Sequence, residues 1–242
     1  MQQIEPLNYG KFYHIYNKGV NSCDLFFEPT NYEHFLKLYD TYISPVADTY
    51  AWVLMKNHFH LLVRIKEEVE IGFLSAAAPS VVQNPDGAIE RENPDGGGDK
   101  NQDYLHPKTL SGSETTERVG LSSRKYNPSH QFSHLFNAYA QAYNKRNGRT
   151  GSLFIHPFKR KLIDDIEYFK NTVVYIHNNP VHHKFTERAM DYPWSSYLTC
   201  ISVKPTRLQR DVVIGWFDSK TNFLAAHENP GDVIDLEKWL GL

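Results

Sequence analysis

Two short apolar segments, residues 49–55 and 58–65, are separated by only Lys56 and Asn57. This spacing predicts a β-hairpin, in which asparagine tolerates the positive φ of a tight turn. Side chains alternate between the faces of a strand, so in His58-Phe59-His60 both histidines point to one face while phenylalanine enters the core. Two adjacent imidazoles can hold one divalent metal through neutral ring nitrogens.

The rest of the pattern predicts an α+β fold. Residues 12–16 alternate as a first strand, and a helix opens at Pro29 and ends before Pro45. Helical spacing returns at residues 129–144, a fourth strand is expected at 152–163, and a last long helix should run from caps at Asp164 and Asp165 to about 178, where Pro180 stops it. The first six elements match a ferredoxin-like antiparallel sheet with helices on one face.

Residues 76–123 lack periodicity and repeat Pro-Asp-Gly, which favours a flexible insertion. We expect residues 1–198 to form one domain around it, because both flanks are needed for one site. Residues 199–242 would form a C-terminal extension that closes with a short helix at 232–242. Two cysteines, no secretory signal pattern and no membrane-length apolar run favour the cytoplasm.

The charge is divided unevenly along the chain, although its formal net value is only -2. Residues 67–117 are strongly acidic, whereas residues 124–163 contain no Asp or Glu. A long basic stretch without acids predicts a surface that faces phosphates, with a merely solvated face as the alternative. Its bases are Arg124, Lys125, Lys145, Arg146, Arg149, Lys159, Arg160 and Lys161.

Tyr175 and Asn179 are four residues apart on the last long helix and therefore share a face. A phenol can attack a phosphodiester, and the Asn179 side-chain oxygen could complete a metal site with two histidines. The residue before a proline is disfavoured in helical conformation, which would take the Asn179 backbone out of the helix. The alternative for Tyr175 is an ordinary core aromatic. His177 lies on a different helix face and is expected at the surface or against DNA, and we interpret His182 and His183 as a loop feature.

These motifs together resemble a known family. The run from Tyr13 through Met55-Lys56-Asn57-His58-Phe59-His60-Leu61-Leu62-Val63 is similar to the IS200-like tyrosine transposases. Further motifs resemble one branch, the REP-associated tyrosine transposases, which are single-tyrosine members of the HUH nuclease superfamily. They are Gly151-Ser152-Leu153-Phe154, Lys159-Arg160-Lys161, Tyr175-Ile176-His177-Asn178-Asn179-Pro180-Val181 and Tyr192-Pro193-Trp194-Ser195-Ser196-Tyr197. The resemblance covers roughly residues 9–198 outside the insertion.

The resemblance implies metal ligation by His58 and His60, with Asn179 in the place of a polar third ligand, and nucleophilic attack by Tyr175. It also implies Mg²⁺ or Mn²⁺, single-stranded DNA with a nearby hairpin, and cleavage and rejoining through a 5′-phosphotyrosine intermediate. A monomer and a homodimer are both compatible with it, because a partner chain supplies the tyrosine helix in some relatives.

Two other functions compete with DNA strand transfer. The first is a non-catalytic module that binds single-stranded nucleic acid, such as a domesticated or decayed transposase, and it would be favoured if Tyr175 were buried far from His58 and His60. The second is a metal-dependent hydrolase with water as its nucleophile. The hydrolase ranks last, since the third strand offers no general base.

Overall fold

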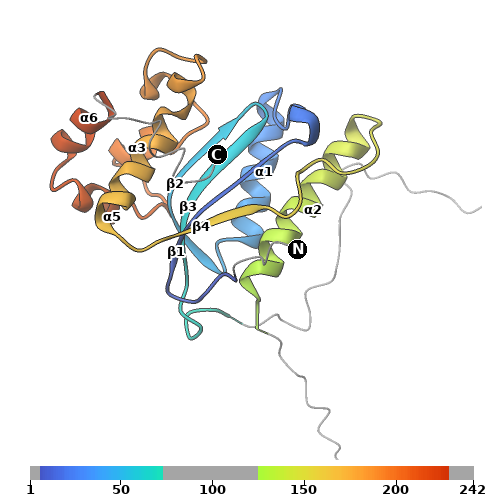
Figure 1. Ribbon diagram of the computed structural model, residues 1–242, viewed down its shortest axis with the longest axis horizontal. Coiled ribbons are helices and arrows are strands. Elements are labelled where there is room, and N and C mark those ends of the chain that lie inside the picture. Colours follow the sequence, from blue (N-terminus) through green and yellow to red (C-terminus); the bar gives the residue numbers. More distant parts are fainter. Residues whose placement is uncertain (1–5, 73–124, 229–242) are drawn as a thin grey trace, which may run out of the picture. The chain divides into compact units, whose positions relative to one another are not determined.

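The computed structural model describes residues 6–72 and 125–228. An antiparallel sheet of four strands in the order β2-β3-β1-β4 forms its centre (Figure 1). The strands are β1 (Phe12–Lys18), β2 (Ala47–Met55), β3 (His58–Ile65) and β4 (Lys159–Ile163). The α-helices are α1 (Pro29–Tyr42), α2 (Pro128–Arg146), α3 (Ile166–His182), α4 (Tyr197–Ile201), α5 (Arg210–Trp216) and α6 (Lys220–Glu228), with short 3₁₀ turns at Val20–Ser22 and Ala189–Asp191.

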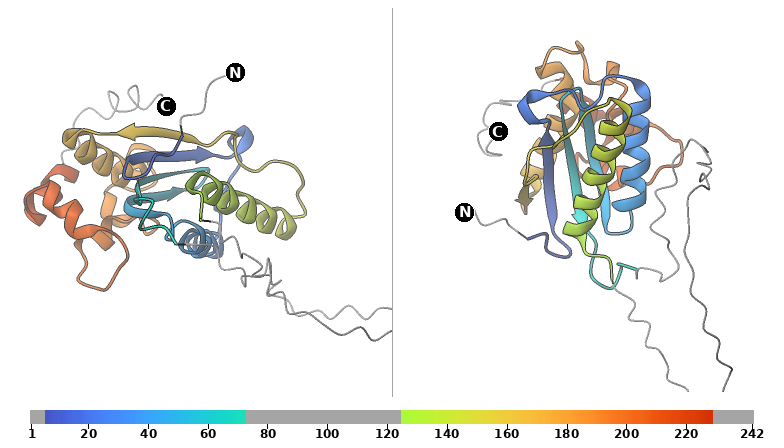
Figure 2. Two further views of the ribbon diagram at one scale, coloured as in Figure 1. Left: turned by 90° about the horizontal axis from the view of Figure 1, so that it is seen from below. Right: turned by 90° about the vertical axis from the view of Figure 1, so that its right-hand side faces the viewer.

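The β1-α1-β2-β3-α2-β4 order and the sheet order confirm the ferredoxin-like prediction. Helices α1 and α2 pack side by side on one face of the sheet, while α3, α5 and α6 lie on the other face (Figures 1 and 2). Successive side chains of β3 point alternately into these two layers. Phe59 is fully buried with α1 and α2, and Leu62 is fully buried on the α3 side.

Strand register brings the relevant side chains to the α3 face. His60 pairs with Tyr16 of β1, and Tyr16 pairs on its other side with Lys159 of β4. Residues that are directly opposite in an antiparallel ladder project to the same face. The α3 face therefore carries His58 and His60 beside two other strands that each contribute polar side chains.

Two predicted boundaries were wrong. The fourth strand covers only Lys159–Ile163, because residues 152–158 form a connection in which Phe154 makes a single bridge to Gly19 and Pro157 has no N–H for a ladder. Helix α3 continues through Pro180 to His182. Pro180 is buried, and packing outweighs the single backbone hydrogen bond that its missing N–H costs in the last turn.

The segment after α3 covers the open edge of the sheet. Trp194 and Ser196 exchange backbone hydrogen bonds with Leu54 and Trp52 of β2, and Gln209 donates to Thr49. The proposed insertion at 76–123 and the expected closing helix at 232–242 lie outside the described residues. No helix among the described ranges is both long and apolar enough to cross a membrane.

Candidate functional site

Helix α3 places Tyr175 and Asn179 against the two histidines of β3. The helix begins at Ile166, and the carboxylate of the N-cap residue Asp165 accepts hydrogen bonds from the backbone N–H groups of Glu167 and Tyr168, as its predicted capping role requires. Asn179 remains helical, so it stays on the same face as Tyr175, one turn away. The predicted departure of its backbone from the helix was therefore wrong.

The contacts between helix and strand are direct. The Tyr175 ring lies edge-on to His60, with 5.3 Å between ring centroids, and the Asn179 Oδ1 atom is 2.9 Å from His58 Nε2. Asn179 is fully buried and Tyr175 is 3% exposed. The fold thus brings together two pairs of residues, one on β3 and one on α3, that are more than a hundred positions apart in sequence.

His58 lies between two amide oxygens. Its Nδ1 atom is 2.7 Å from Asn57 Oδ1 and its Nε2 atom is 2.9 Å from Asn179 Oδ1, and both oxygens can only accept. Burial lowers the pKa of His58 to about 4, so the ring is neutral near pH 7 and has one proton for the two contacts. When Nδ1 donates to Asn57, the nearer oxygen, His58 Nε2 and Asn179 Oδ1 face each other as two acceptors.

Facing acceptors at this separation suit a shared cation. Neighbouring ligand atoms of an octahedral ion with bonds of ~2.1 Å are ~3.0 Å apart. The Asn179 Nδ2 atom is buried without a hydrogen-bond partner in the described structure, so no internal contact other than that to His58 fixes this amide. Among the described residues, no group of three or more His, Cys, Asp or Glu side chains could hold a metal. The fitting donor set is two imidazoles with one amide oxygen.

His14 was missed by the sequence reasoning. Its Nε2 atom lies 2.9 Å from Nδ1 of His60, and the two rings stack at 5.0 Å between centroids. This contact occupies Nδ1, so Nε2 is the nitrogen that His60 can present to a metal. Burial lowers the pKa of His14 to about 3 and that of His60 well below its usual value, which keeps both rings neutral.

His183 is a second residue that the sequence reasoning did not place. It caps the end of α3, and its ring lies 5.0 Å from that of His58 between centroids. The interpretation of His182 and His183 as a loop feature was wrong for His182, which belongs to α3. The only sequence signal for His183 was its spacing of one further turn from Asn179.

His177 contradicts its predicted place at the surface. It is fully buried between Ser196 and His227 of α6. The reason is that α6 packs on α3, which the sequence did not reveal.

Some of the predicted DNA-binding bases are engaged within the protein. Lys125 pairs with Glu68 at 3.2 Å, and Arg146 pairs with Glu28 at 2.8 Å. Arg149 donates to Asn144 Oδ1 and to a backbone carbonyl. Such partners neutralise or orient these cations in the free protein.

The remaining predicted bases are split between the faces of the sheet. Lys159 and Lys161 pair in register with Tyr16 and His14, so they share the face of the two β3 histidines. Arg160 lies on the other face, with its guanidinium 3.8 Å from the centre of the Phe158 ring. Lys145 is in the last turn of α2, and Arg124 lies outside the described residues.

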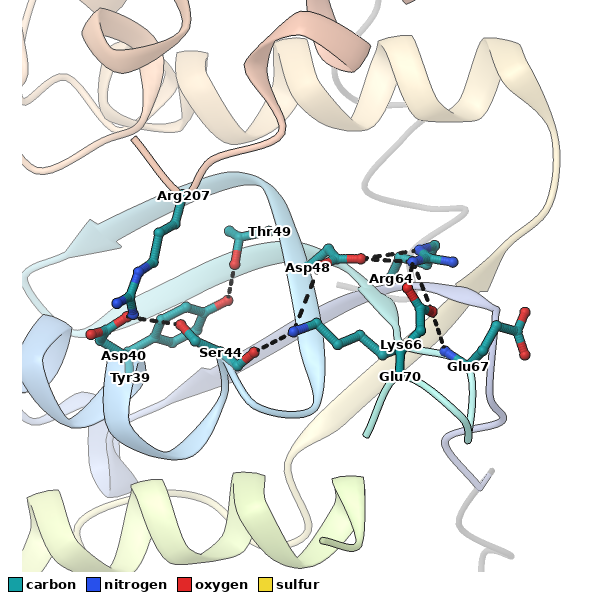
Figure 3. Close-up of polar contacts among 10 residues, drawn as sticks. All are labelled: Tyr39, Asp40, Ser44, Asp48, Thr49, Arg64, Lys66, Glu67, Glu70 and Arg207. Carbon is teal, nitrogen blue, oxygen red and sulfur yellow. Dashed lines mark hydrogen bonds and ion pairs between the residues drawn. The ribbon is translucent and has the colours of Figure 1, made fainter. Parts of the chain in front are cut away.

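A cleft of about 610 Å³ lies elsewhere, between α1, β2 and residues 199–209. Its floor includes Leu54 and Leu61 from the α1 layer, and none of the candidate metal or tyrosine residues appears among its described lining. Figure 3 shows that the charged groups at its rim are paired, with Arg207 on Asp40 and Lys66 near Asp48. The cleft is therefore distinct from the histidine site.

A comparison with solved structures supports the fold, whereas two comparisons by sequence found no match. No protein-family model and no curated protein matches the sequence. The fold is similar to that of a solved structure described as a REP-associated tyrosine transposase bound to a REP hairpin. The TM-score is 0.52 at 12% sequence identity, and the match covers 85% of this chain and 88% of that one. The two chains share a fold through a remote relationship.

Proposed function

We propose that this protein is a metal-dependent strand transferase that cleaves and rejoins single-stranded DNA near hairpins, with Tyr175 as its nucleophile. The observation that carries this proposal is the meeting of α3 with β3. The Tyr175 ring is 5.3 Å from the His60 ring between centroids, and Asn179 Oδ1 is 2.9 Å from His58 Nε2. The remote fold relative was solved with a REP hairpin, which supports hairpin DNA as the substrate class.

In this reaction the Tyr175 oxygen attacks the phosphorus of a DNA phosphodiester. A bond forms between phosphorus and the phenol oxygen, the bond to the 3′ oxygen breaks, and the phenol proton is transferred overall to the released 3′ hydroxyl. The product is a 5′-phosphotyrosine link, and the reverse attack by a 3′ hydroxyl rejoins DNA.

His58, His60 and Asn179 would hold Mg²⁺ or Mn²⁺, which when bound would polarise a non-bridging phosphate oxygen. His14 holds the His60 ring through Nδ1, and Asn57 holds the His58 ring through Nδ1. When both Nδ1 atoms donate in these contacts, the Nε2 atoms of His58 and His60 are unprotonated and lose no proton on binding the metal.

DNA would approach along the face that carries Lys159 and Lys161. An exposed lysine beside the site offers a partner for flanking phosphates. Tyr175 is only 3% exposed, so entry of a phosphate requires a movement of α3 or of the tyrosine side chain. Such a movement within one chain and exchange of α3 between two copies are both compatible with the proposal.

The low exposure of Tyr175 also favours a second candidate, a non-catalytic module that binds single-stranded nucleic acid. Under that function the phenol is a core aromatic in the cluster with Tyr197 and Val173. The proximity of Tyr175 to His60 and His14 argues against it, since a ring serving only the core needs no imidazole neighbours.

The test is a denaturing gel of the protein with labelled single-stranded hairpin DNA and Mn²⁺. We expect a covalent adduct with the wild type and with Tyr168→Phe, a matched control at an exposed tyrosine in the first turn of the same helix. Tyr175→Phe should give no adduct. DNA binding without an adduct across varied hairpins and metals would instead support the binding module, and cleavage by Tyr175→Phe would refute the assigned nucleophile.

A further inference from the structure

A continuous chain of hydrogen bonds joins the C-terminal helices to the helix of Tyr175. His227 of α6 contacts His177 of α3, with 2.9 Å between His227 Nε2 and His177 Nδ1. On its other side His177 Nε2 lies 2.7 Å from Ser196 Oγ. We call His227, His177 and Ser196 the histidine chain.

The direction of each hydrogen bond follows from its ends. The carbonyl of Phe223 can only accept, so His227 Nδ1 donates to it over 2.7 Å. Burial lowers the pKa of His227 to about 4, so near neutral pH its Nε2 atom is unprotonated and accepts from His177 Nδ1. The Ser196 hydroxyl lies 3.3 Å from the Trp52 carbonyl and 2.7 Å from His177 Nε2, and we assign its one proton to the shorter contact.

The histidine chain ends at the sheet. Ser196 Oγ accepts the backbone N–H of Trp52 on β2 at 2.9 Å. Every donor and acceptor of the three side chains is used, and each of these side chains is at most 5% exposed. A serine hydroxyl that contacts a histidine resembles the nucleophile of a hydrolase, but Ser196 and His177 are fully buried, which excludes substrate from them.

His177 lies midway between Tyr175 and Asn179 in the sequence of α3. Side chains two positions apart on a helix point about 200° apart, so the His177 side chain points away from the side that meets the β3 histidines. Helix α3 is consequently held on one side by the sheet and on another by α6 and Ser196. Any change in the histidine chain acts on the same helical turn that carries both site residues.

We propose that the histidine chain is a positioning device, through which His227 of α6 sets the place of Tyr175 against His60 and of Asn179 against His58. The effect on catalysis rests on the proposed function. His227 is a positioning residue that touches neither DNA nor metal. The consequence is that α6 belongs to the active unit, although it follows the ferredoxin-like elements in sequence.

The first test uses His227→Leu and the conservative His227→Gln, whose amide can both accept from His177 and donate to Phe223. Val213→Ala is the matched control, because Val213 is fully buried in α5 in the same core cluster and makes none of the chain's hydrogen bonds. A displacement of about 1 Å in a catalytic group can cost ~100-fold in rate. We expect His227→Leu to lower the single-turnover rate of adduct formation by ~10–100-fold with an unchanged dissociation constant for hairpin DNA, and His227→Gln to restore most of it.

The second test does not require activity. Long-range ¹⁵N–¹H spectra of protein with labelled imidazoles report the protonated nitrogen of His177 and the surroundings of His58 and His60. Spectra are recorded below the melting temperature of each variant, so that every protein is folded. We expect His227→Leu to shift the His58 and His60 resonances and Val213→Ala to leave them unchanged.

The two tests separate the two proposals. An inactive wild type with shifted His58 and His60 resonances in His227→Leu would sink the strand transferase and keep the positioning device. His58 and His60 resonances that do not change in His227→Leu, or that change equally in Val213→Ala, would overturn the positioning device whatever the activity.

Discussion

His227 should make the stability of this protein depend on pH. Its ring is buried between α3 and α6, and burial lowers its pKa from 6.5 to about 4. In the unfolded chain the same ring takes up a proton below about pH 6.5, whereas in the folded protein it stays neutral to about pH 4. The stability that its neutral form contributes is therefore complete above pH 6.5 and is lost as the pH falls towards 4.

The magnitude follows from the size of this pKa shift. Each pH unit between 6.5 and 4 costs about 1.4 kcal/mol per such group, so a fall from pH 7 to pH 5 removes about 2 kcal/mol of folding free energy through His227 alone. His14 and His177 are lowered for the same reason and add to the total loss in the same direction. Typical domains have only about 5–15 kcal/mol, so this loss is measurable.

A difference between two proteins isolates the share of His227. Urea unfolding in the presence of EDTA would give the free energy of unfolding at pH 7, 6 and 5 for the wild type and for His227→Leu. The other buried histidines cancel in the difference, so we expect the advantage of the wild type over the variant to shrink by about 2 kcal/mol between pH 7 and pH 5. A difference that stays constant across this range would refute the neutral, buried state of His227 and the hydrogen-bond directions derived from it.

Three further predictions concern α3 and the DNA face. Asp165→Ala should lower the free energy of unfolding by about 1 kcal/mol, because two backbone N–H groups lose their cap, and urea titration would measure it. Asn179→Asp should tighten Mn²⁺ binding in a calorimetric titration, since a carboxylate adds charge to the oxygen that faces His58; weaker binding would exclude that oxygen as a ligand. Lys159→Gln should reduce the salt dependence of DNA binding by about one released ion, whereas Arg146→Gln, whose cation is paired with Glu28, should change it less.

Local patterns in the sequence predicted the ferredoxin-like core well. The hairpin at Lys56-Asn57 and the alternation of His58-Phe59-His60 are properties of neighbouring residues, and the structure has both. The shared face of Tyr175 and Asn179 is also local, because it depends only on helical spacing. Their meeting with the β3 histidines was predicted from the chemistry of the side chains and from the resemblance of the motifs to a family.

The missed residues depend on distant contacts. His14 meets His60 because β1 and β3 pair in a register that neither strand encodes alone. His177 is buried because α6 covers it, and α6 is a short helix with a weak amphipathic pattern. Pro180 was taken as a stop signal, but its local cost is small beside the burial of the α3 end.

The two layers of the protein differ in the kind of residue that they bury, and this difference bears on function. Phe35, Phe59 and Phe136 belong to the aromatic layer under α1 and α2. The other face also has an apolar cluster, but it buries four histidines as well, His14, His60, His177 and His227, each of which needs a hydrogen-bond partner to offset its lost hydration. A sheet that only needed a second core would be more stable with apolar residues there. The buried histidines are therefore consistent with the proposed chemistry, and the alternation of β3 allows one strand to supply Phe59 to the core and His58 and His60 to the candidate site.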